Sequence, residues 1–256
     1  EPLIIQSLKI SYPKLKIATL LSPADFEDSP NSQDAMRYFH AMYSLSDLAI
    51  VHGLRNVINI WGYKKLISVN TILRKEILNI NICRTKNIYC LLGGGTVNVG
   101  YSFSESTIKI AKLCMDASVY LKEYKMIIVC SSQNIYDALK EYKYGENVIL
   151  HDGILNVQQC YSKAGLVITR SGRNTLSELA YLGIPTLSFL SGCQYRKAEQ
   201  QQNMESLSVH NVKPVSINIQ LEQLVELIKD MLRMKYQREM FNPGNKQALQ
   251  EILKLY

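Results

Sequence analysis

The sequence lacks the patterns that would place it at once in several classes of protein. No stretch approaches the roughly 18 consecutive apolar residues of a membrane-spanning helix. No run of five Lys or Arg residues suggests a nucleic-acid-binding tail, and no pair among the six cysteines has C-x-x-C spacing. These absences argue against a transmembrane protein, a nucleic-acid partner and a cysteine metal site, so we expect no bound metal. We expect the cysteines to be buried, reduced thiols in a cytosolic protein.

The composition is that of an ordinary globular protein with a basic excess. The 256 residues suit one large domain or two small ones, and 47% apolar with 20% charged residues is typical of a folded soluble chain. The formal net charge is +7. A basic excess favours anionic partners such as nucleotides or anionic lipid headgroups, but it does not choose between them.

Short apolar runs recur along the whole chain. They are rich in Ile, Val and Leu and mostly do not alternate with polar residues, which is typical of strands covered on both faces. We therefore expect parallel strands at 15–21, 47–52, 65–70, 87–93, 125–131, 147–152, 165–169, 184–190 and 212–217.

Helical patterns fill the gaps between these runs. Ile108, Ala111, Met115 and Val119 fall on one helical stripe. Similar stripes occur over 134–142, 175–182, 198–207 and 221–234. Strands that alternate with single helices predict right-handed βαβ units in a doubly wound α/β sheet.

A polar segment, "RTKN" at 84–87, precedes a fresh strand, and we place a domain boundary there. The residues after it provide a complete βαβαβ series. The residues before it provide only about three strands and two helices, which is little for a separate domain. We expect this first half to be completed by a missing N-terminal region or by a partner chain.

Two glycine-bearing loops follow predicted strands. In "LLGGGTVNVGYS" (91–102) three glycines end a strand, and glycine lets the backbone turn sharply and lets a ligand approach bare amides. The loop has neither the third glycine of G-x-G-x-x-G nor the G-K-[ST] of a P-loop. A plain strand-to-helix connection is therefore an equal alternative.

The second loop lies in "TRSGRNTLSELAYLGIP" (169–185), where Ser171 and Gly172 follow a strand and a helix is expected from about Asn174 or Thr175. Bare amides at a helix N-terminus suit a diphosphate, and the Glu178 carboxylate can accept two hydrogen bonds from a ribose cis-diol. Thr175-x-x-Glu178 is also a capping box, which would tie Glu178 to the backbone. Arg173 favours the ligand, because a cation beside a helix N-terminus is unfavourable unless an anion lies there.

A third element, "SGCQYRKAEQQQNMESL" (191–207), places several amides and a carboxylate at the start of a predicted helix. Such groups can bind sugar hydroxyls. The alternative is a solvated first turn in which Glu199 interacts with the helix dipole.

In this order the three elements resemble the donor-nucleotide half of GT-B glycosyltransferases. The similarity is greatest to the MurG-type family, with its family 28 C-terminal donor-binding domain, which adds N-acetylglucosamine from its UDP-sugar to a lipid-linked acceptor. "VITRSGRNTLSELAYLGIPTLSF…EQQQN" (167–203) is similar to that family's nucleotide-sugar signature. "NTILRKEI" (70–77) is similar to the linker into the second domain, and "LLGGGT" to the glycine loop that opens it.

The resemblance implies a GT-B-like architecture. It contains a Rossmann-type doubly wound donor-binding domain at 85–256, preceded by a partial acceptor-side α/β domain at 1–84. It implies transfer of a sugar from a nucleoside-diphosphate sugar, a UDP-N-acetylhexosamine, to a hydroxyl acceptor without a cofactor or a required metal. A UDP-sugar hydrolase, and a donor-binding subunit inactive without a partner chain, are the alternatives. The protein would be cytoplasmic and peripherally associated with membranes, with the basic stretch 227–240 as either a docking surface or a helix packed on its own domain.

Site residues follow from the same resemblance. Glu178 would hold the ribose, Ser171 and Gly172 the diphosphate, Arg173 the departing phosphate charge, and Ile154 the base. The complete set expected to bind the donor is Gly94, Gly95, Thr96, Ile154, Ser171, Gly172, Arg173, Glu178, Glu199, Gln200 and Asn203. The chain departs from the family in reading G-G-G-T-V-N where G-G-S-x-G is usual, and in having no glycine-rich acceptor loop before residue 65. The catalytic base stays unassigned, because His40, His52, His151 and His210 are expected to be structural or surface residues.

Overall fold

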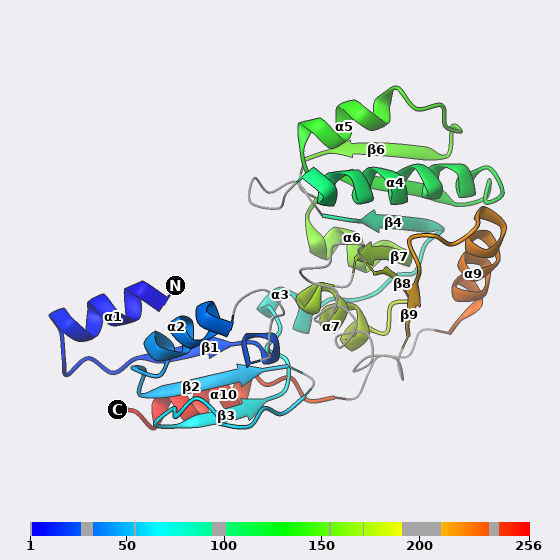
Figure 1. The fold of residues 1–256 in the computed structure, drawn as a ribbon. Helices are drawn as coiled ribbons and strands as arrows, with labels where there is room; N and C mark the ends of the chain where they lie inside the picture. Colours follow the sequence, from blue (N-terminus) through cyan, green and yellow to red (C-terminus); the bar gives the residue numbers. More distant parts are fainter. Residues whose placement is uncertain are drawn as a thin grey trace. The chain divides into compact units, whose positions relative to one another are not determined.

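The computed structural model describes residues 2–26, 33–53, 55–93, 101–153, 155–170, 172–190, 211–235 and 241–256. The chain divides into two compact units: Glu1–Leu73 with Phe241–Tyr256, and Arg74–Met240. Each unit contains a parallel sheet with helices beside it (Figure 1). None of the helices described combines the length and the hydropathy that a bilayer crossing requires.

The sheet of the second unit has the strand order β6-β5-β4-β7-β8-β9, and its neighbouring strands are parallel. Its strands are β4 (Asn87–Leu91), β5 (Lys125–Cys130), β6 (Val148–Asp152), β7 (Ala164–Arg170), β8 (Thr186–Phe189) and β9 (Val212–Val215). Counted along the chain, this is the 3-2-1-4-5-6 order of Rossmann-type folds. All positions of β7 and β8 are buried, as expected for parallel strands that are covered on both faces. The predicted doubly wound sheet is confirmed.

Four described helices of this unit lie between its strands in the chain: α4 (Tyr101–Ser118), α5 (Gln133–Lys140), α6 (Val157–Lys163) and α7 (Arg173–Leu182). Helix α3 (Lys75–Leu78) precedes β4, and α9 (Leu221–Arg233) follows β9. The stripe on α4 is buried at Ala111 and Met115, but Val119 follows the end of the helix and is 51% exposed. The stripe prediction is therefore wrong at Val119. The predicted helix at 198–207 lies outside the described residues.

Helix α9 contains the first half of the basic stretch at 227–240. One face of the helix is buried in the unit's core through Leu224, Val225, Ile228, Met231 and Leu232. On its outer face Lys229 and Arg233 pair with Glu226 and Asp230. The described part is therefore packed on its own domain, which was one of the two expectations for this stretch. Residues 236–240 lie outside the described part.

The first unit contains a smaller parallel sheet, in the order β1-β2-β3. Its elements are α1 (Pro2–Ser11), β1 (Ala18–Leu21), a 3₁₀ helix (Pro23–Phe26), α2 (Gln33–Tyr43), β2 (Leu48–His52), β3 (Leu66–Val69) and α10 (Asn245–Leu253). Ala248 of α10 is buried in one cluster with Leu48, Ile50 and Val69. The C-terminal helix therefore completes the core of the first unit.

This division differs from the sequence-based boundary at 84/85. The units divide between Leu73 and Arg74, and residues 241–256 belong to the first unit instead of the second. The C-terminal segment is held in the first unit by contacts between residues far apart in the sequence. For example, the Gly244 N–H donates to the Thr71 carbonyl over 3.0 Å. A Cβ at Gly244 would lie 2.0 Å from the Asn70 carbonyl oxygen, so only glycine fits there without a shift.

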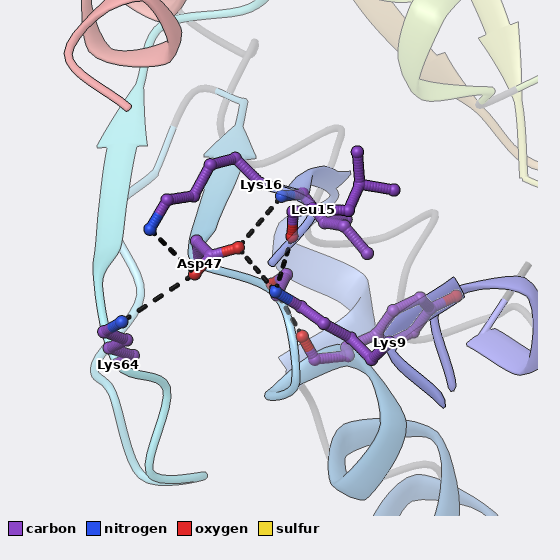
Figure 2. Close-up of polar contacts among 8 residues, drawn as sticks. Lys9, Leu15, Lys16, Asp47 and Lys64 are labelled. Atoms are coloured by element: carbon purple, nitrogen blue, oxygen red, sulfur yellow. Dashed lines mark hydrogen bonds and ion pairs between the residues drawn. The ribbon is translucent and has the colours of Figure 1, made fainter. Parts of the chain in front are cut away.

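One carboxylate holds together the segments that lead into this sheet. Asp47 accepts hydrogen bonds from Lys9 Nζ (2.7 Å) and the Ile17 N–H (3.0 Å), and Figure 2 shows Lys16 and Lys64 directed at its other oxygen. Those two Nζ atoms lie 3.8 and 3.7 Å from Oδ1. Burial by itself would raise the pKa of Asp47, but the hydrogen bonds from Lys9 and Ile17 and the lysine charges outweigh it, so this pKa is lower than usual.

We expect Asp47→Asn to destabilise the protein by about 1–3 kcal/mol at pH 7, the scale of a hydrogen bond to a charged group. The variant keeps the shape of the side chain but leaves the three lysine charges of Figure 2 without their carboxylate. Chemical denaturation at pH 7 measures the loss of unfolding free energy.

The pH dependence has a defined sign. Because the pKa of Asp47 is lowered in the folded state, its contribution is present above the ordinary value of about 3.9 and is lost as the pH falls through the lower folded-state value. The wild type and the variant should therefore converge in acid. Asp34→Asn is the matched control, since the Asp34 side chain is 99% exposed. Equal losses in the two variants would contradict a specific role for Asp47.

Candidate functional site

The strand order of the second unit defines a switch point between β4 and β7. The chain continues from β4 to β5 on one side and from β7 to β8 on the other, so the two loops leave the sheet in opposite directions. Doubly wound sheets bind ligands at this position, beyond the carboxyl ends of the strands. The Thr169 hydroxyl donates to the Leu91 carbonyl over 2.8 Å and ties the two strand ends together.

After β4, the backbone turns at Gly93, whose φ of +63° favours glycine. This supports the expectation that the first glycine of the triplet serves a sharp turn. The following residues, among them Gly94, Gly95 and Thr96, lie outside the described residues.

After β7, the chain turns directly into α7. Gly172 is the N-cap residue, and the first intrahelical hydrogen bond runs from the Leu176 N–H to the Gly172 carbonyl. The helix thus begins at Arg173, one or two residues before the expected start. No side chain in the described part of the chain caps this helix, whose first-turn amides lie at the positive end of the helix dipole. The amide of Gly172 itself donates to the Arg170 carbonyl over 2.6 Å.

Gly172 is not required by the described fold. Its φ is −75°, which any residue adopts, and among the residues that the structure describes a Cβ built there would meet only the Arg170 carbonyl oxygen, at 4.0 Å. Glycine is therefore not needed here for a special backbone conformation. What glycine leaves at this exposed N-cap is room for another molecule to approach the backbone.

Two arginines flank the turn. Arg170, the last residue of β7, is buried, and its Nη1 donates to the Thr107 hydroxyl of α4 over 2.8 Å. Arg173, the first residue of α7, is half-buried. The turn therefore combines the positive end of a helix dipole with two guanidinium side chains, an arrangement that favours an anion.

Glu178 lies on the buried face of α7, with its side chain 4% exposed. Its carboxylate is held from two sides. Arg74 donates from Nε to Oε1 and from Nη2 to Oε2, both over 2.7 Å, and the Tyr161 hydroxyl donates to Oε2 over 3.3 Å. The capping-box alternative is wrong, because the N-cap is Gly172 and both carboxylate oxygens are bound to side chains.

Arg74 is the site residue that sequence reasoning missed. It is the N-cap residue of α3, inside the "NTILRKEI" stretch compared above with a domain linker, and it precedes Glu178 by 104 residues. The hydrogen bonds to Glu178 raise the pKa of Arg74. Burial raises the pKa of Tyr161, and the Glu178 charge adds to this shift. The three groups form one bonded network that keeps the carboxylate in a defined orientation.

The described residues include Gly172, Arg173 and Glu178 of the expected donor-binding set, and the first turn and a half of α7 carries all three. The other members lie outside the described residues. They are Gly94, Gly95, Thr96, Ile154, Ser171, Glu199, Gln200 and Asn203.

His40 is one of the histidines that the structure describes, and its surroundings give it a structural role. His40 is buried in an aromatic cluster, stacked on Trp61, with its ring nitrogens bonded to the Tyr63 hydroxyl and the Asp25 carbonyl. Since a carbonyl can only accept, Nε2 carries the proton and Nδ1 accepts from Tyr63. Burial lowers the pKa of His40, which is structural as expected.

Among the described cysteines, Cys90, Cys114, Cys130 and Cys160 are buried thiols as expected, whereas Cys83 is exposed. Within the described ranges, no group of three or more His, Cys, Asp or Glu side chains could hold a metal ion.

Comparison with known proteins places this geometry in a family. Residues 97–256, more than half of the chain, match the glycosyltransferase family 28 C-terminal domain. The chain belongs to this family. The match includes β5 to β9, α4, α7 and α9, and so contains the turn at Gly172 and the Glu178 carboxylate.

Two curated relatives carry the name UDP-N-acetylglucosamine--N-acetylmuramyl-(pentapeptide) pyrophosphoryl-undecaprenol N-acetylglucosamine transferase. The protein of Halalkalibacterium halodurans is 26% identical over 159 residues, covering 61% of this chain and 42% of its own. The protein of Desulforamulus reducens is 32% identical over 119 residues, which cover 43% of this chain and 31% of the relative. The chain therefore spans less than half the length of these relatives.

Solved structures share the fold at lower identity. Acinetobacter baumannii MurG superposes with a TM-score of 0.61 at 13% identity, over 99% of this chain and 77% of that one. The structure of an Arabidopsis thaliana UGT complexed with UDP-L-rhamnose superposes with a TM-score of 0.63 at 10% identity, over 99% of this chain and 69% of that one. These likenesses confirm the expected GT-B fold.

The two glycines that flank β7 should respond differently to alanine. A Cβ at Gly165 would lie 2.5 Å from the Thr85 carbonyl oxygen, whereas a Cβ at Gly172 has room. We expect Gly165→Ala to lose about 3 kcal/mol or more by overpacking. Gly172→Ala should lose at most about 1 kcal/mol, the difference between the residues at an N-cap.

Urea denaturation of the two variants measures this difference. A loss at Gly172→Ala as large as that at Gly165→Ala would mean that glycine is needed there for the fold itself.

Proposed function

We propose that this chain is the donor-binding part of a glycosyltransferase that transfers a sugar from a nucleoside-diphosphate sugar to a hydroxyl. One observation supports this most directly. An uncapped helix begins at the switch point of a Rossmann-type sheet, behind a glycine that the described fold does not require. Family membership and the names of the two curated relatives support a UDP-N-acetylhexosamine as the donor.

In this proposal the α7 N-terminus stabilises the leaving group. The bond from sugar carbon C1 to the diphosphate oxygen breaks, the acceptor hydroxyl oxygen bonds to C1, and a base takes the hydroxyl proton. Negative charge grows on the departing diphosphate. The first-turn amides, the helix dipole and Arg173 supply the opposite charge, already oriented before the reaction begins.

Glu178 provides the contact to the ribose. A carboxylate accepts two hydrogen bonds from a cis-diol, and a side chain that is 4% exposed makes such bonds in a medium where they are strong. Because Glu178 lies on the same helix as the phosphate-binding turn, one element would set the spacing between ribose and diphosphate.

The acceptor is proposed from the relatives alone. Their printed name specifies an undecaprenol-linked acceptor, and the basic excess of this chain suits an anionic membrane surface. We propose a lipid-linked hydroxyl acceptor and a peripheral position on the cytoplasmic face of a membrane.

Binding of UDP tests the proposal. At a hundredfold excess of UDP over its dissociation constant, the wild type should gain about 2.7 kcal/mol of unfolding free energy. Uridine, which lacks the diphosphate, should bind far more weakly. Gly172→Val should stay folded but gain no stability from UDP, because the side chain fills the space that the diphosphate needs. Thermal denaturation with and without each ligand measures all of these effects.

Equal affinity for uridine and UDP would show that α7 holds no diphosphate. Turnover then separates the activities. Release of sugar from UDP-N-acetylglucosamine without an acceptor would identify a hydrolase, and release only with an acceptor would identify a transferase. Binding without turnover would identify a donor-binding subunit that needs a partner chain.

A further inference from the structure

The Arg74–Glu178 pair occupies the carboxylate that the proposed function assigns to the ribose. Arg74 binds both oxygens over 2.7 Å, and the Tyr161 hydroxyl binds Oε2 as well. These two partners of Glu178 differ in their exposure to solvent. The Arg74 side chain is 54% exposed, whereas Tyr161 is buried, with 1% of its surface exposed.

Hydrogen-bonding capacity limits what Glu178 can accept in addition. A carboxylate offers about four lone-pair sites, two on each oxygen. Arg74 uses one on each oxygen and Tyr161 uses the second on Oε2, so the described contacts leave one site, on Oε1. A ribose cis-diol donates two hydrogen bonds. One of the existing donors must therefore withdraw before the diol can bind with both hydroxyls.

The environment of each donor decides which one withdraws. Displacing the Tyr161 hydroxyl would leave a buried donor without an acceptor, which is strongly unfavourable. Displacing Arg74 moves a guanidinium that is already half exposed into water, where it is fully hydrated. Arg74 is the donor that can leave.

We propose that Arg74 is a positioning residue which orients the Glu178 carboxylate before the donor binds and is displaced from it by the ribose diol. This inference rests on the proposed function, since it takes Glu178 as the ribose ligand. Breaking the Arg74–Glu178 pair costs free energy and so weakens the binding of the diol. The ratio of affinities for a ribose ligand and for a ligand that lacks one hydroxyl is therefore smaller in the wild type than in a protein without Arg74.

Comparison of UDP with 2′-deoxy-UDP tests this exchange. The deoxy ligand donates one hydrogen bond fewer and fits the remaining site without displacing Arg74. In Arg74→Gln the preference for UDP over 2′-deoxy-UDP should increase about tenfold relative to the wild type, the scale of a hydrogen bond to a charged group. Isothermal titration of both ligands into both proteins measures the ratio of dissociation constants.

Arg84→Gln is the matched control. Arg84 lies in the same unit and binds the Leu232 and Met234 carbonyls, so its loss should lower stability without changing the preference between the ligands. Arg74→Lys covers the case in which Arg74→Gln fails to fold. A lysine keeps the charge but donates to one oxygen at a time, so the preference for UDP should shift in the same direction by a smaller factor.

The outcomes separate the two proposals. If the wild type binds neither ligand, the proposed function fails. If UDP binds and binding depends on Gly172, but Arg74→Gln has the wild-type preference, Arg74 is only a structural partner and this inference alone is overturned. Equal weakening of both ligands in Arg74→Gln would also overturn it, because Arg74 would then contact the nucleotide somewhere other than the diol.

Discussion

The parallel pairing of β4 with β7 is the constraint on which the rest of the second unit depends. These strands meet in register from Ile88–Leu166 to Leu91–Thr169, and every residue of β7 is buried. The close approach requires Gly165, where a Cβ would collide with the Thr85 carbonyl oxygen. Because the crossovers from β4 and β7 run to opposite sides, this pairing alone brings the glycine loop and the start of α7 to one edge of the sheet.

The buried carboxylate of Glu178 lies near this edge and is stabilised by Arg74. A carboxylate as buried as that of Glu178 requires hydrogen-bond donors, because burial removes its hydration. The bidentate guanidinium supplies both charge and geometry, and Tyr161 supplies a third hydrogen bond. The carboxylate is thereby held in one orientation by side chains of its own unit. The exposed side of Arg74 leaves the pair able to open.

Consecutive residues are anchored in different units where the chain first crosses between them. The Leu73 N–H and carbonyl both bond to the side chain of Asn245, in the first unit, while Arg74 binds Glu178, in the second. The first unit has its own stabilising contacts, which include the C-terminal helix and the Asp47 cluster of Figure 2.

The strands and their parallel arrangement could be predicted from sequence because burial on both faces leaves a local pattern. Each of the nine expected strands is present, with ends shifted by up to three residues. The helix after Gly172 was also predicted, but its start and its cap were not, since Thr175 and Glu178 fit a capping box as well as an interior turn. Short helices without a stripe, such as α6, gave no periodic signal.

By itself, then, the sequence determined the α/β class, the order of the elements and the helix that carries Gly172 and Glu178, because apolar runs and turn residues act over a few neighbours. Only the tertiary structure decided that Glu178 is bound by Arg74, 104 residues earlier, and that residues 241–256 return to the first unit. These outcomes depend on which distant side chains and carbonyls come within bonding distance after the sheets have formed. The residues next to Arg74 in the sequence do not indicate which distant carboxylate it will bind in the folded protein.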